Sequence, residues 1–554
     1  MESRGILSRR DEGESCRALC GEGTAAAVAP FDLPAPTMMD SQETNVGRQF
    51  SRHEILLTGG SGFLGKVVLG LLLDRFPEVS HIHFLSRPSR DFSAEDRFEK
   101  DILASPALAP VVESHGREAL RKKITVWAGD VSKPQFGLSA RALERMRGRA
   151  GVIINCAGRV DFLPPVDESF SSNVDGAEHA VEVAKWLGAA LLHVSTAFVS
   201  GKSDGLIEET EPILGYYPRR RGPNDRSFDA QEEIAHCREQ IRRIKESSNG
   251  GGKSTREQAK RLIALGERRA EHWGWVNTYT YAKSLGEQVI AAETGIRCAI
   301  VRPAIVESAL RFPFPGWIEG GRTAAPLVLM ALGGMKAWPV RRDMPLEIVP
   351  VDLVAAAILT VAALLLDGRN APVYHLATAD VNPIHLGTLV RWLESEAQKR
   401  QRAEGGRKPA AGWFDRQKRV RFVSVEQARA RRAHLARRVH RLQSILEKYH
   451  KASVPLPGKK ALANWSMALR TLELQAKFRE QTLDQYLPFI LHNRYIFECE
   501  NIRAGYERIA SGDRERLPWD PQDIAWKDYW IHNQVPGIER WVQPDAVKEW
   551  AFRI

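Results

Sequence analysis

The sequence predicts an α/β fold, in which a doubly wound parallel sheet with helices on both faces precedes a mostly helical C-terminal domain. Three observations predict it. Short apolar runs alternate with helix-length segments from residue 54 to about residue 302. A glycine-rich turn follows the first apolar run, and the alternation fades after residue 378. Strands that are apolar on both faces and separated by helices are typical of a parallel sheet that helices cover.

The elements follow from the apolar runs in chain order. Strands are predicted at 55–57, 82–85, 124–127, 152–154, 191–194 and 298–301. Helices between and after them are predicted at 67–75, 140–146, 174–187 and 282–292. The longest apolar run, 353–366, is shorter than the roughly 20 residues that a membrane span needs. Asp352 precedes it as the predicted N-cap, so we expect a buried helix there.

Composition divides the chain into three parts. Residues 1–50 mix Ala, Pro, Gly and charged residues, and we expect an unfolded leader. Residues 51–378 form the first domain, and residues 379–554 form the helical second domain. The first domain contains a long polar insertion at 201–278, and long insertions at the C-terminal edge of such a sheet tend to build the substrate site. Two helices are predicted in the insertion, near 231–245 and 256–272.

The net charge of +11 is concentrated in one segment. Residues 399–451 carry 17 Lys and Arg against 4 Asp and Glu, whereas the rest of the chain is slightly acidic. Apolar residues recur there at helical spacing, which predicts a basic amphipathic helix at 424–449. The helix either packs on its own domain with a solvated basic face, or meets anionic lipid headgroups or substrate phosphates. No nucleic-acid-binding motif accompanies the charge, so no nucleic-acid partner is expected.

Six cysteines are scattered along the chain without a C-x-x-C pair. This spacing indicates neither a disulfide framework nor a metal site, and it favours a reduced, cytoplasmic protein. Contact with a membrane surface, if the basic helix makes one, is then peripheral.

The glycine-rich turn reads T-G-G-S-G-F-L-G and lies between a predicted strand and a predicted helix. In this context G-x-x-G-x-x-G is typical of a dinucleotide-binding, Rossmann-type fold. The first glycine allows the tight turn, the second lets backbone N–H groups approach a pyrophosphate, and the third lets helix and strand pack closely. The residues expected to line the dinucleotide here are Thr58, Gly59, Ser61, Gly62, Phe63, Leu64 and Gly65.

The ends of the next strands indicate which dinucleotide binds. Sites that prefer NAD carry an acid after the second strand, but Arg87 stands in that region. An arginine can bind a 2′-phosphate with two parallel hydrogen bonds, so NADPH is the predicted cofactor. Asp130 and Val131 end the third strand near the expected adenine. Cys156 and Ala157 end the fourth, where small residues let the centre of the cofactor lie close.

A Tyr-x-x-x-Lys pair, Tyr279 and Lys283, carries the predicted chemistry. A spacing of four places both side chains on one helix face, where the ammonium stabilises the phenolate and lowers the pKa of the tyrosine. Ser195 and Thr196 close the fifth strand at the same edge as the glycine loop. We expect Thr196 and Tyr279 to hydrogen-bond and protonate the oxyanion that hydride transfer creates on a carbonyl.

Together these motifs resemble the extended short-chain dehydrogenase/reductases, and more narrowly the fatty acyl-CoA reductases of the soluble bacterial type. The segments that carry the resemblance are TGGSGFLG at 58–65, VSTAF at 194–198, YTYAK at 279–283, VRPAIVES at 301–308 and FPGWIEG at 314–320. The resemblance covers roughly residues 51–390 and, more loosely, 462–545.

The resemblance implies that NADPH reduces a long-chain acyl-CoA through a bound aldehyde to a primary alcohol and free CoA. It implies Tyr279 as proton donor with Lys283 as its partner, Thr196 as second oxyanion donor, and Pro303 as a wall of the nicotinamide pocket. The insertion and the second domain would wall an acyl tunnel. The CoA phosphates would meet the arginines at 219–221 or the basic segment 399–451.

Three alternatives stay open at this point. A two-electron reductase would release the aldehyde. A sugar-nucleotide enzyme of the same fold would need the acid that the second strand lacks. A silent dinucleotide-binding scaffold would not need Thr196, Tyr279 and Lys283 together.

Overall fold

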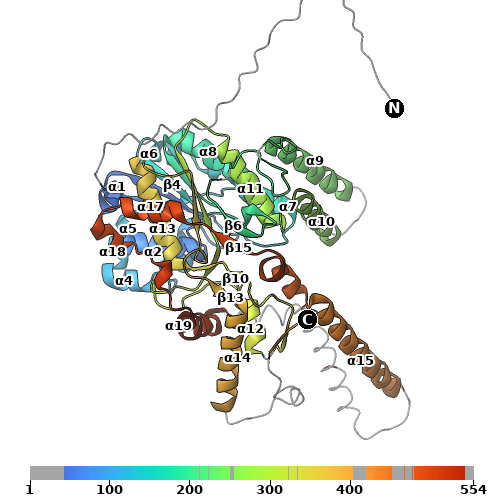
Figure 1. The fold of residues 1–554 in the computed structure, drawn as a ribbon. Coiled ribbons are helices and arrows are strands. Elements are labelled where there is room, and N and C mark those ends of the chain that lie inside the picture. The colour runs from blue at the N-terminus through green and yellow to red at the C-terminus, as the bar shows by residue number, and fades with distance from the viewer. Residues whose placement is uncertain are drawn as a thin grey trace, which may run out of the picture. The chain divides into compact units, whose positions relative to one another are not determined.

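The computed structural model describes residues 43–542, except positions 211, 223, 250–254, 322, 334, 404–419 and, apart from 467 and 477, 452–479. Its centre is a sheet of seven parallel strands in the order β12-β7-β5-β4-β1-β2-β3 (Figure 1). The strands are β1 (Glu54–Thr58), β2 (Ile82–Ser86), β3 (Ile124–Ala128), β4 (Ala150–Asn155), β5 (Ala190–Val194), β7 (Cys298–Pro303) and β12 (Val373–Leu376). The predicted fold class and all six predicted strands are confirmed, and β12 is an additional edge strand. The strand order reverses at β1, so a crevice opens beyond the carboxyl ends of β1 and β4.

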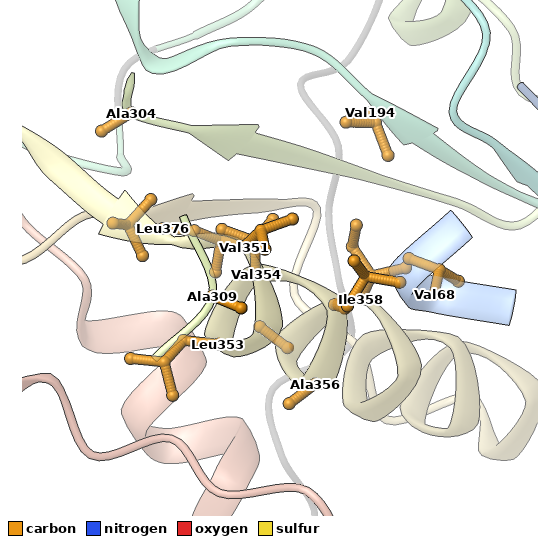
Figure 2. Packing of buried hydrophobic residues seen from close by; sticks show 14 of the residues in the cluster. Val68, Val194, Ala304, Ala309, Val351, Leu353, Val354, Ala356, Ile358 and Leu376 are labelled. Carbon is orange, nitrogen blue, oxygen red and sulfur yellow. The ribbon is translucent and has the colours of Figure 1, made fainter. Parts of the chain in front are cut away.

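Helices cover both faces of this sheet. One face is covered by α2 (Phe63–Arg75) and α13 (Val351–Asp367), and Figure 2 shows Ile358 of α13 beside Val68 of α2. The other face is covered by α6 (Ala140–Met146) and α8 (Asp175–Leu187). A third apolar cluster joins α7 (Val166–Asn173) and α11 (Thr278–Ala291) to the insertion helices α9 (Ala230–Asn249) and α10 (Thr255–Trp273).

The buried helix predicted around 353–366 is present, but its predicted cap is wrong. Pro350 occupies the N-cap position of α13, and Asp352 lies inside the first turn. The buried carboxylate accepts hydrogen bonds from the backbone N–H groups of Leu310, Arg311 and Phe312, at 2.8, 2.8 and 3.1 Å. Asp352 therefore anchors a distant loop rather than the end of its own helix.

The predicted leader is also too long at its C-terminal end. The helix α1 (Val46–Arg52) begins before residue 50, and Asn45 caps it. Thr44 forms a backbone bridge with Ile509, so this segment is tied to the C-terminal part of the chain. The rest of the predicted leader, residues 1–42, lies outside the described residues.

Contacts among the described residues cross the predicted boundary at residue 378. The short strand β15 (Tyr495–Phe497) pairs in parallel with β6 (Gly205–Ile207) of the insertion. The helix α17 (Glu500–Arg508) packs on β12 and α13. The C-terminal part also contributes α14 (Leu386–Ala403), which packs on α12 (Ala325–Leu332), and α15 (Val425–Lys451), which lies where the basic helix is predicted. Among the described residues, no helix is long and apolar enough to cross a membrane.

Candidate active site

The glycine loop connects β1 to α2 at the crevice. Gly59 has a φ of +67°, and a Cβ there would lie 2.4 Å from the backbone nitrogen of Ala157. A Cβ on Gly65 would lie 2.2 Å from the carbonyl oxygen of Gly59. Gly62 differs, because its φ is −82° and the nearest atom to an added Cβ is 3.4 Å away. Two glycines therefore permit close backbone packing, and the third borders open space.

That open space lies at the N-terminus of α2, where Gly62 is the N-cap and supplies no side-chain hydrogen bond. The first-turn N–H groups of a helix lack acceptors within the helix and carry a partial positive charge. An uncapped N-terminus beside an open glycine fits a pyrophosphate. The residues present therefore fit the dinucleotide cofactor that the sequence predicts.

The other predicted loop residues divide by exposure. Ser61 is exposed, while Phe63 and Leu64 are half-buried, and the Phe63 ring packs 5.1 Å from that of Trp317. Thr58 is buried, and its hydroxyl donates to Asn155 Oδ1 at 2.5 Å. The side chain of Thr58 thus joins β1 to β4, so that any contact it makes with a cofactor comes from its backbone.

The two residues predicted at the adenosine end lie together. Arg87 follows β2 with 70% of its side chain exposed, and its Nη1 is 3.8 Å from Asp130 Oδ2 beyond β3. Asp130 also accepts hydrogen bonds from the N–H and hydroxyl of Ser132. The carbonyl oxygen of Val131 contacts His179 Nδ1 at 2.8 Å. An exposed guanidinium beside a fixed carboxylate is available to a phosphate that arrives with the cofactor.

The predicted catalytic residues converge at the carboxyl edge of the sheet. Thr196 caps the short helix η3 (Ala197–Ser200), and its hydroxyl donates to the carbonyl oxygen of Pro303 at 3.4 Å. Its side chain lies within hydrogen-bonding reach of the Tyr279 hydroxyl. Lys283 Nζ donates to the carbonyl oxygen of Val194 at 2.8 Å. Ser195 is buried at the same strand end, and its Oγ has no hydrogen-bond partner among the described residues.

Burial shifts the two titrating groups of this site in opposite directions. It raises the pKa of Tyr279 to about 12, against a smaller lowering by the hydrogen bond with Thr196. It lowers the pKa of Lys283 to about 8, which the carboxylate of Glu287 partly opposes. At neutral pH the tyrosine is therefore protonated and the lysine is charged. The expectation that Lys283 lowers the pKa of Tyr279 is therefore not met, because burial is the larger effect. A tyrosine that stays protonated still suits proton donation to an oxyanion.

The neighbouring tyrosine, Tyr281, is held elsewhere. Its hydroxyl donates to Glu233 Oε1 and lies 3.1 Å from Cys237 Sγ, both on α9. Glu233 in turn pairs with Arg269 of α10. Tyr281 therefore fastens the insertion to α11 and is not free to meet a substrate.

Small residues follow β4 where the cofactor centre is predicted. Cys156 is next to Ala157, and burial raises the pKa of its thiol to about 12, so it is a neutral wall. A Cβ on Gly158 would lie 2.8 Å from Lys283 Nζ and 2.9 Å from Asn173 Oδ1. Because Gly158 has no Cβ, the side chains of Lys283 and Asn173 can both lie against its backbone.

Sequence reasoning missed three polar residues under the site. Asn155 accepts from Thr58, and its Nδ2 lies 3.1 Å from His193 Nδ1, so a buried polar chain crosses β1, β4 and β5. Asn173 binds both backbone groups of Arg159, at 3.0 and 3.1 Å. The sequence signal for Asn155 and His193 is weak, namely a polar residue inside an otherwise apolar strand.

A narrow apolar cavity begins beside the catalytic residues. Phe198, whose backbone N–H donates to Thr196 Oγ1 at 3.4 Å, forms part of its wall. The other walls come from α12, α14, the segment 338–348 and residues 486–495. The described residues that line this cavity include none from the insertion 201–278. The expectation that the insertion walls an acyl tunnel is therefore not met in this cavity.

Comparison with known proteins identifies the family. The model of a nicotinamide-nucleotide-binding family, described as "Male sterility protein", matches residues 57–358, which is more than half of the chain. The chain belongs to this family. Two similar relatives match along nearly their whole length. A "Probable fatty acyl-CoA reductase 5" of Arabidopsis thaliana is 27% identical over 88% of this chain and 97% of its own. An "Alcohol-forming fatty acyl-CoA reductase" of Simmondsia chinensis is 27% identical over 87% of this chain and 96% of its own.

Among solved structures, one similar chain is the terminal R domain from the myxalamid PKS-NRPS biosynthetic pathway. It is 17% identical over 88% of this chain and 90% of its own, with a TM-score of 0.49. The family match shows that the cofactor is a nicotinamide dinucleotide, as the glycine loop predicts. The assignment to a bacterial type stays a prediction.

Proposed function

We propose that this chain reduces long-chain fatty acyl-CoA with NADPH, through a bound aldehyde, to a primary alcohol and free CoA. The observation that carries the proposal is the position of Thr196, Tyr279 and Lys283. Thr196 and Tyr279 are within hydrogen-bonding reach of each other, Lys283 Nζ donates to the carbonyl oxygen of Val194 at the end of β5, and an apolar cavity begins at Phe198, two residues after Thr196. The names of the relatives, one of them an alcohol-forming fatty acyl-CoA reductase, support the same reaction.

When bound, the nicotinamide supplies hydride to the carbonyl carbon. The hydroxyls of Thr196 and Tyr279 hydrogen-bond the thioester oxygen as it becomes negative. Tyr279 gives its proton to that oxygen, and the Lys283 ammonium stabilises the phenolate. The resulting hemithioacetal loses CoA thiol and leaves an aldehyde, whose carbonyl oxygen can occupy the same place. Once a second NADPH has replaced the oxidised cofactor and Tyr279 has regained a proton from solvent, Tyr279 would protonate the aldehyde oxygen as the carbonyl carbon is reduced, which yields the alcohol.

The apolar side chains that line the cavity match the apolar acyl chain of the proposed substrate. Leu327, Val390 and Leu393 line it together with aromatic side chains, and a polymethylene chain gains roughly 0.8 kcal/mol for each CH₂ buried among such groups. The cavity is narrow, with a volume of about 50 Å³. A long chain therefore enters only if flexible wall side chains such as the leucines change rotamer.

For the cofactor, Arg87 supports NADPH over NADH. Its guanidinium is exposed at the end of β2, where the ribose of a bound dinucleotide lies in this fold. At the end of β2 itself, where NAD-preferring sites carry an acid for the free 2′-hydroxyl, this chain has Ser86 and Arg87. A 2′-phosphate would replace the long contact between Arg87 and Asp130 with a charge-assisted one.

The test combines stoichiometry with a pair of matched variants. Purified protein is mixed with NADPH and palmitoyl-CoA, and NADPH loss, free CoA and lipid product are measured together. Two NADPH consumed per CoA released indicates alcohol, and one indicates release of the aldehyde. Tyr279→Phe is expected to reduce turnover at least about 100-fold, the usual contribution of a general acid. Tyr281→Phe is the control and is expected to retain turnover.

Two results would overturn the proposal. One is no NADPH consumption with acyl-CoA of any chain length. The other is a Tyr279→Phe variant that binds NADPH and turns over at the wild-type rate.

A further inference from the structure

An open hollow of about 770 Å³ lies in the insertion, apart from the site described above. Its volume falls in the range of roughly 300–1,000 Å³ that is usual for ligand pockets. The walls come from the loop 217–227 and from the end of α10. The side chains that line it include Tyr217, Arg219, Arg221, Asp225, His272 and Trp273.

Two arginines, Arg219 and Arg221, line this hollow. Neither Arg219 nor Arg221 forms an ion pair with a carboxylate of the described residues, and Arg219 Nη1 donates only to the carbonyl oxygen of His272, at 3.1 Å. Asp225, a carboxylate that also lines the hollow, accepts from the Tyr217 hydroxyl and from the backbone N–H groups of Arg221 and Ser227, at 2.6, 3.0 and 2.9 Å. These three donors hold the pKa of Asp225 well below its usual range. The two guanidinium groups are therefore left for an external anion.

Aromatic side chains, Tyr217 and Trp273, also line the hollow. Tyr217 and Trp273 meet edge to face, with ring centroids 5.3 Å apart, and Phe228 packs against both. Tyr217 is buried, whereas Trp273 is half-buried and lines the hollow. A partly exposed indole is a platform on which a purine can stack.

Residues close in the chain to those that line the hollow are bonded to the segment that follows Thr196. Tyr216 donates from its hydroxyl to the carbonyl oxygen of Ser200 at 2.8 Å, and Trp275 Nε1 donates to that of Val199 at 2.8 Å. Both acceptors lie in η3, which Thr196 caps. A Cβ on Gly201 would overlap the Pro218 ring, with only 2.1 Å between atoms, so the loop and η3 pack without a gap. The loop that carries Arg219 and Arg221 thus packs on η3, and Phe198 of η3 lines the apolar cavity.

We propose that this hollow binds the nucleotide end of coenzyme A, with Arg219 and Arg221 on its phosphates and the adenine against Trp273. The inference rests on the proposed function and names the site that holds the part of the substrate farthest from the reaction. A phosphate group matches the fork of a guanidinium, and an aromatic surface beside it selects a nucleotide over a free phosphate. The thioester would then reach Thr196 along η3, and the acyl chain would continue past Phe198 into the apolar cavity.

The test compares substrates with and without the nucleotide. The double variant Arg219→Ala/Arg221→Ala is assayed with NADPH against palmitoyl-CoA, the palmitoyl thioester of N-acetylcysteamine, and palmitaldehyde. The KM for palmitoyl-CoA is expected to rise at least about tenfold, because each lost charge-assisted hydrogen bond weakens binding by about that factor. The kinetic constants for the two substrates without a nucleotide are expected to stay within about twofold. Arg226→Ala removes an exposed arginine of the same loop that does not line the hollow, and it is expected to change nothing.

Direct binding separates failure of this inference from failure of the proposed function. Calorimetry with adenosine 3′,5′-bisphosphate and with inorganic phosphate, on the wild type and on the single variants Arg219→Gln and Arg221→Gln, does not depend on turnover. Tight binding of the bisphosphate alone, lost in both variants, supports the site. An unchanged KM for palmitoyl-CoA in the double variant would overturn it, as would an equal loss with all three substrates. The double variant is also assayed with palmitoyl acyl carrier protein. If activity falls with that substrate alone, the arginines bind a protein partner and the inference is overturned.

Discussion

Alanine substitutions at two glycines of the phosphate loop, Gly65 and Gly62, should affect stability differently. In Gly65→Ala the new Cβ would lie 2.2 Å from the Gly59 carbonyl oxygen and 2.7 Å from Gly60 Cα. Both are backbone atoms, so the loop must move by most of an ångström to restore normal contact. Forced overpacking of this kind costs about 1–3 kcal/mol, against up to about 1 kcal/mol regained from helix propensity. We expect Gly65→Ala to lower the free energy of unfolding and to weaken cofactor binding.

In Gly62→Ala the backbone φ of −82° suits alanine, and the nearest atom to the Cβ is 3.4 Å away. Stability should change by less than about 0.5 kcal/mol, as at other uncrowded surface positions. The methyl group would nevertheless stand at the open N-terminus of α2, where the pyrophosphate is expected, and should weaken NADPH binding at least about tenfold.

Thermal unfolding and NADPH titration by fluorescence separate the two variants. Gly62→Ala should have a wild-type Tm and a raised Kd, while Gly65→Ala should change both. The reasoning is refuted if Gly65→Ala retains the wild-type Tm and Kd, or if Gly62→Ala binds NADPH as the wild type does.

Two further predictions concern the charges of the site. Burial lowers the pKa of Lys283 to about 8, so kcat/KM should fall as pH rises through about 8. The variant Lys283→Arg stays charged, so in an active variant this fall should move to higher pH. The pKa of Lys283 in the folded protein lies below the 10.5 of an ordinary lysine, so between these values the unfolded chain binds more protons. The contribution of Lys283 to stability should therefore rise with pH across that window. A rate profile that stays flat up to about pH 10 would contradict the lowered pKa. Arg87→Ala should raise the KM for NADPH far more than that for NADH, and equal losses for both cofactors would exclude a 2′-phosphate contact.

Much of the fold was predictable because its signals are local. The six predicted strands are apolar runs that can be recognised in the sequence, and α6 begins and ends where its apolar spacing predicts. The strands β12, β6 and β15 are only three or four residues long, and what makes them strands is the partner beside them. Asp352 was predicted to be a helix cap because it precedes an apolar run. In the structure its carboxylate accepts hydrogen bonds from three backbone N–H groups of a loop about 40 residues earlier in the chain.

The candidate site divides in the same way. The spacing of Tyr279 and Lys283 on one helix follows from helix geometry alone. The choice of Tyr279 over Tyr281 as the residue near Thr196 is visible in the contacts, since Glu233 and Cys237 on α9 hold the second hydroxyl. Asn173 and Gly158, which close on Lys283, carry no spacing signal because they come from separate elements.

By itself, the amino-acid order determined the parallel sheet, the glycine loop and the Tyr-x-x-x-Lys helix, since each depends on neighbours within a few positions and on the carboxyl ends of parallel strands meeting at one edge. Only the tertiary structure decided that β15 and α17 from beyond residue 378 pair with and pack on the first part of the chain, that α12 and α14 wall part of the apolar cavity, and that no carboxylate of the described residues pairs with Arg219 or Arg221. These features arise from contacts between residues far apart in the chain, whose pairing depends on shape and burial rather than on any repeating pattern.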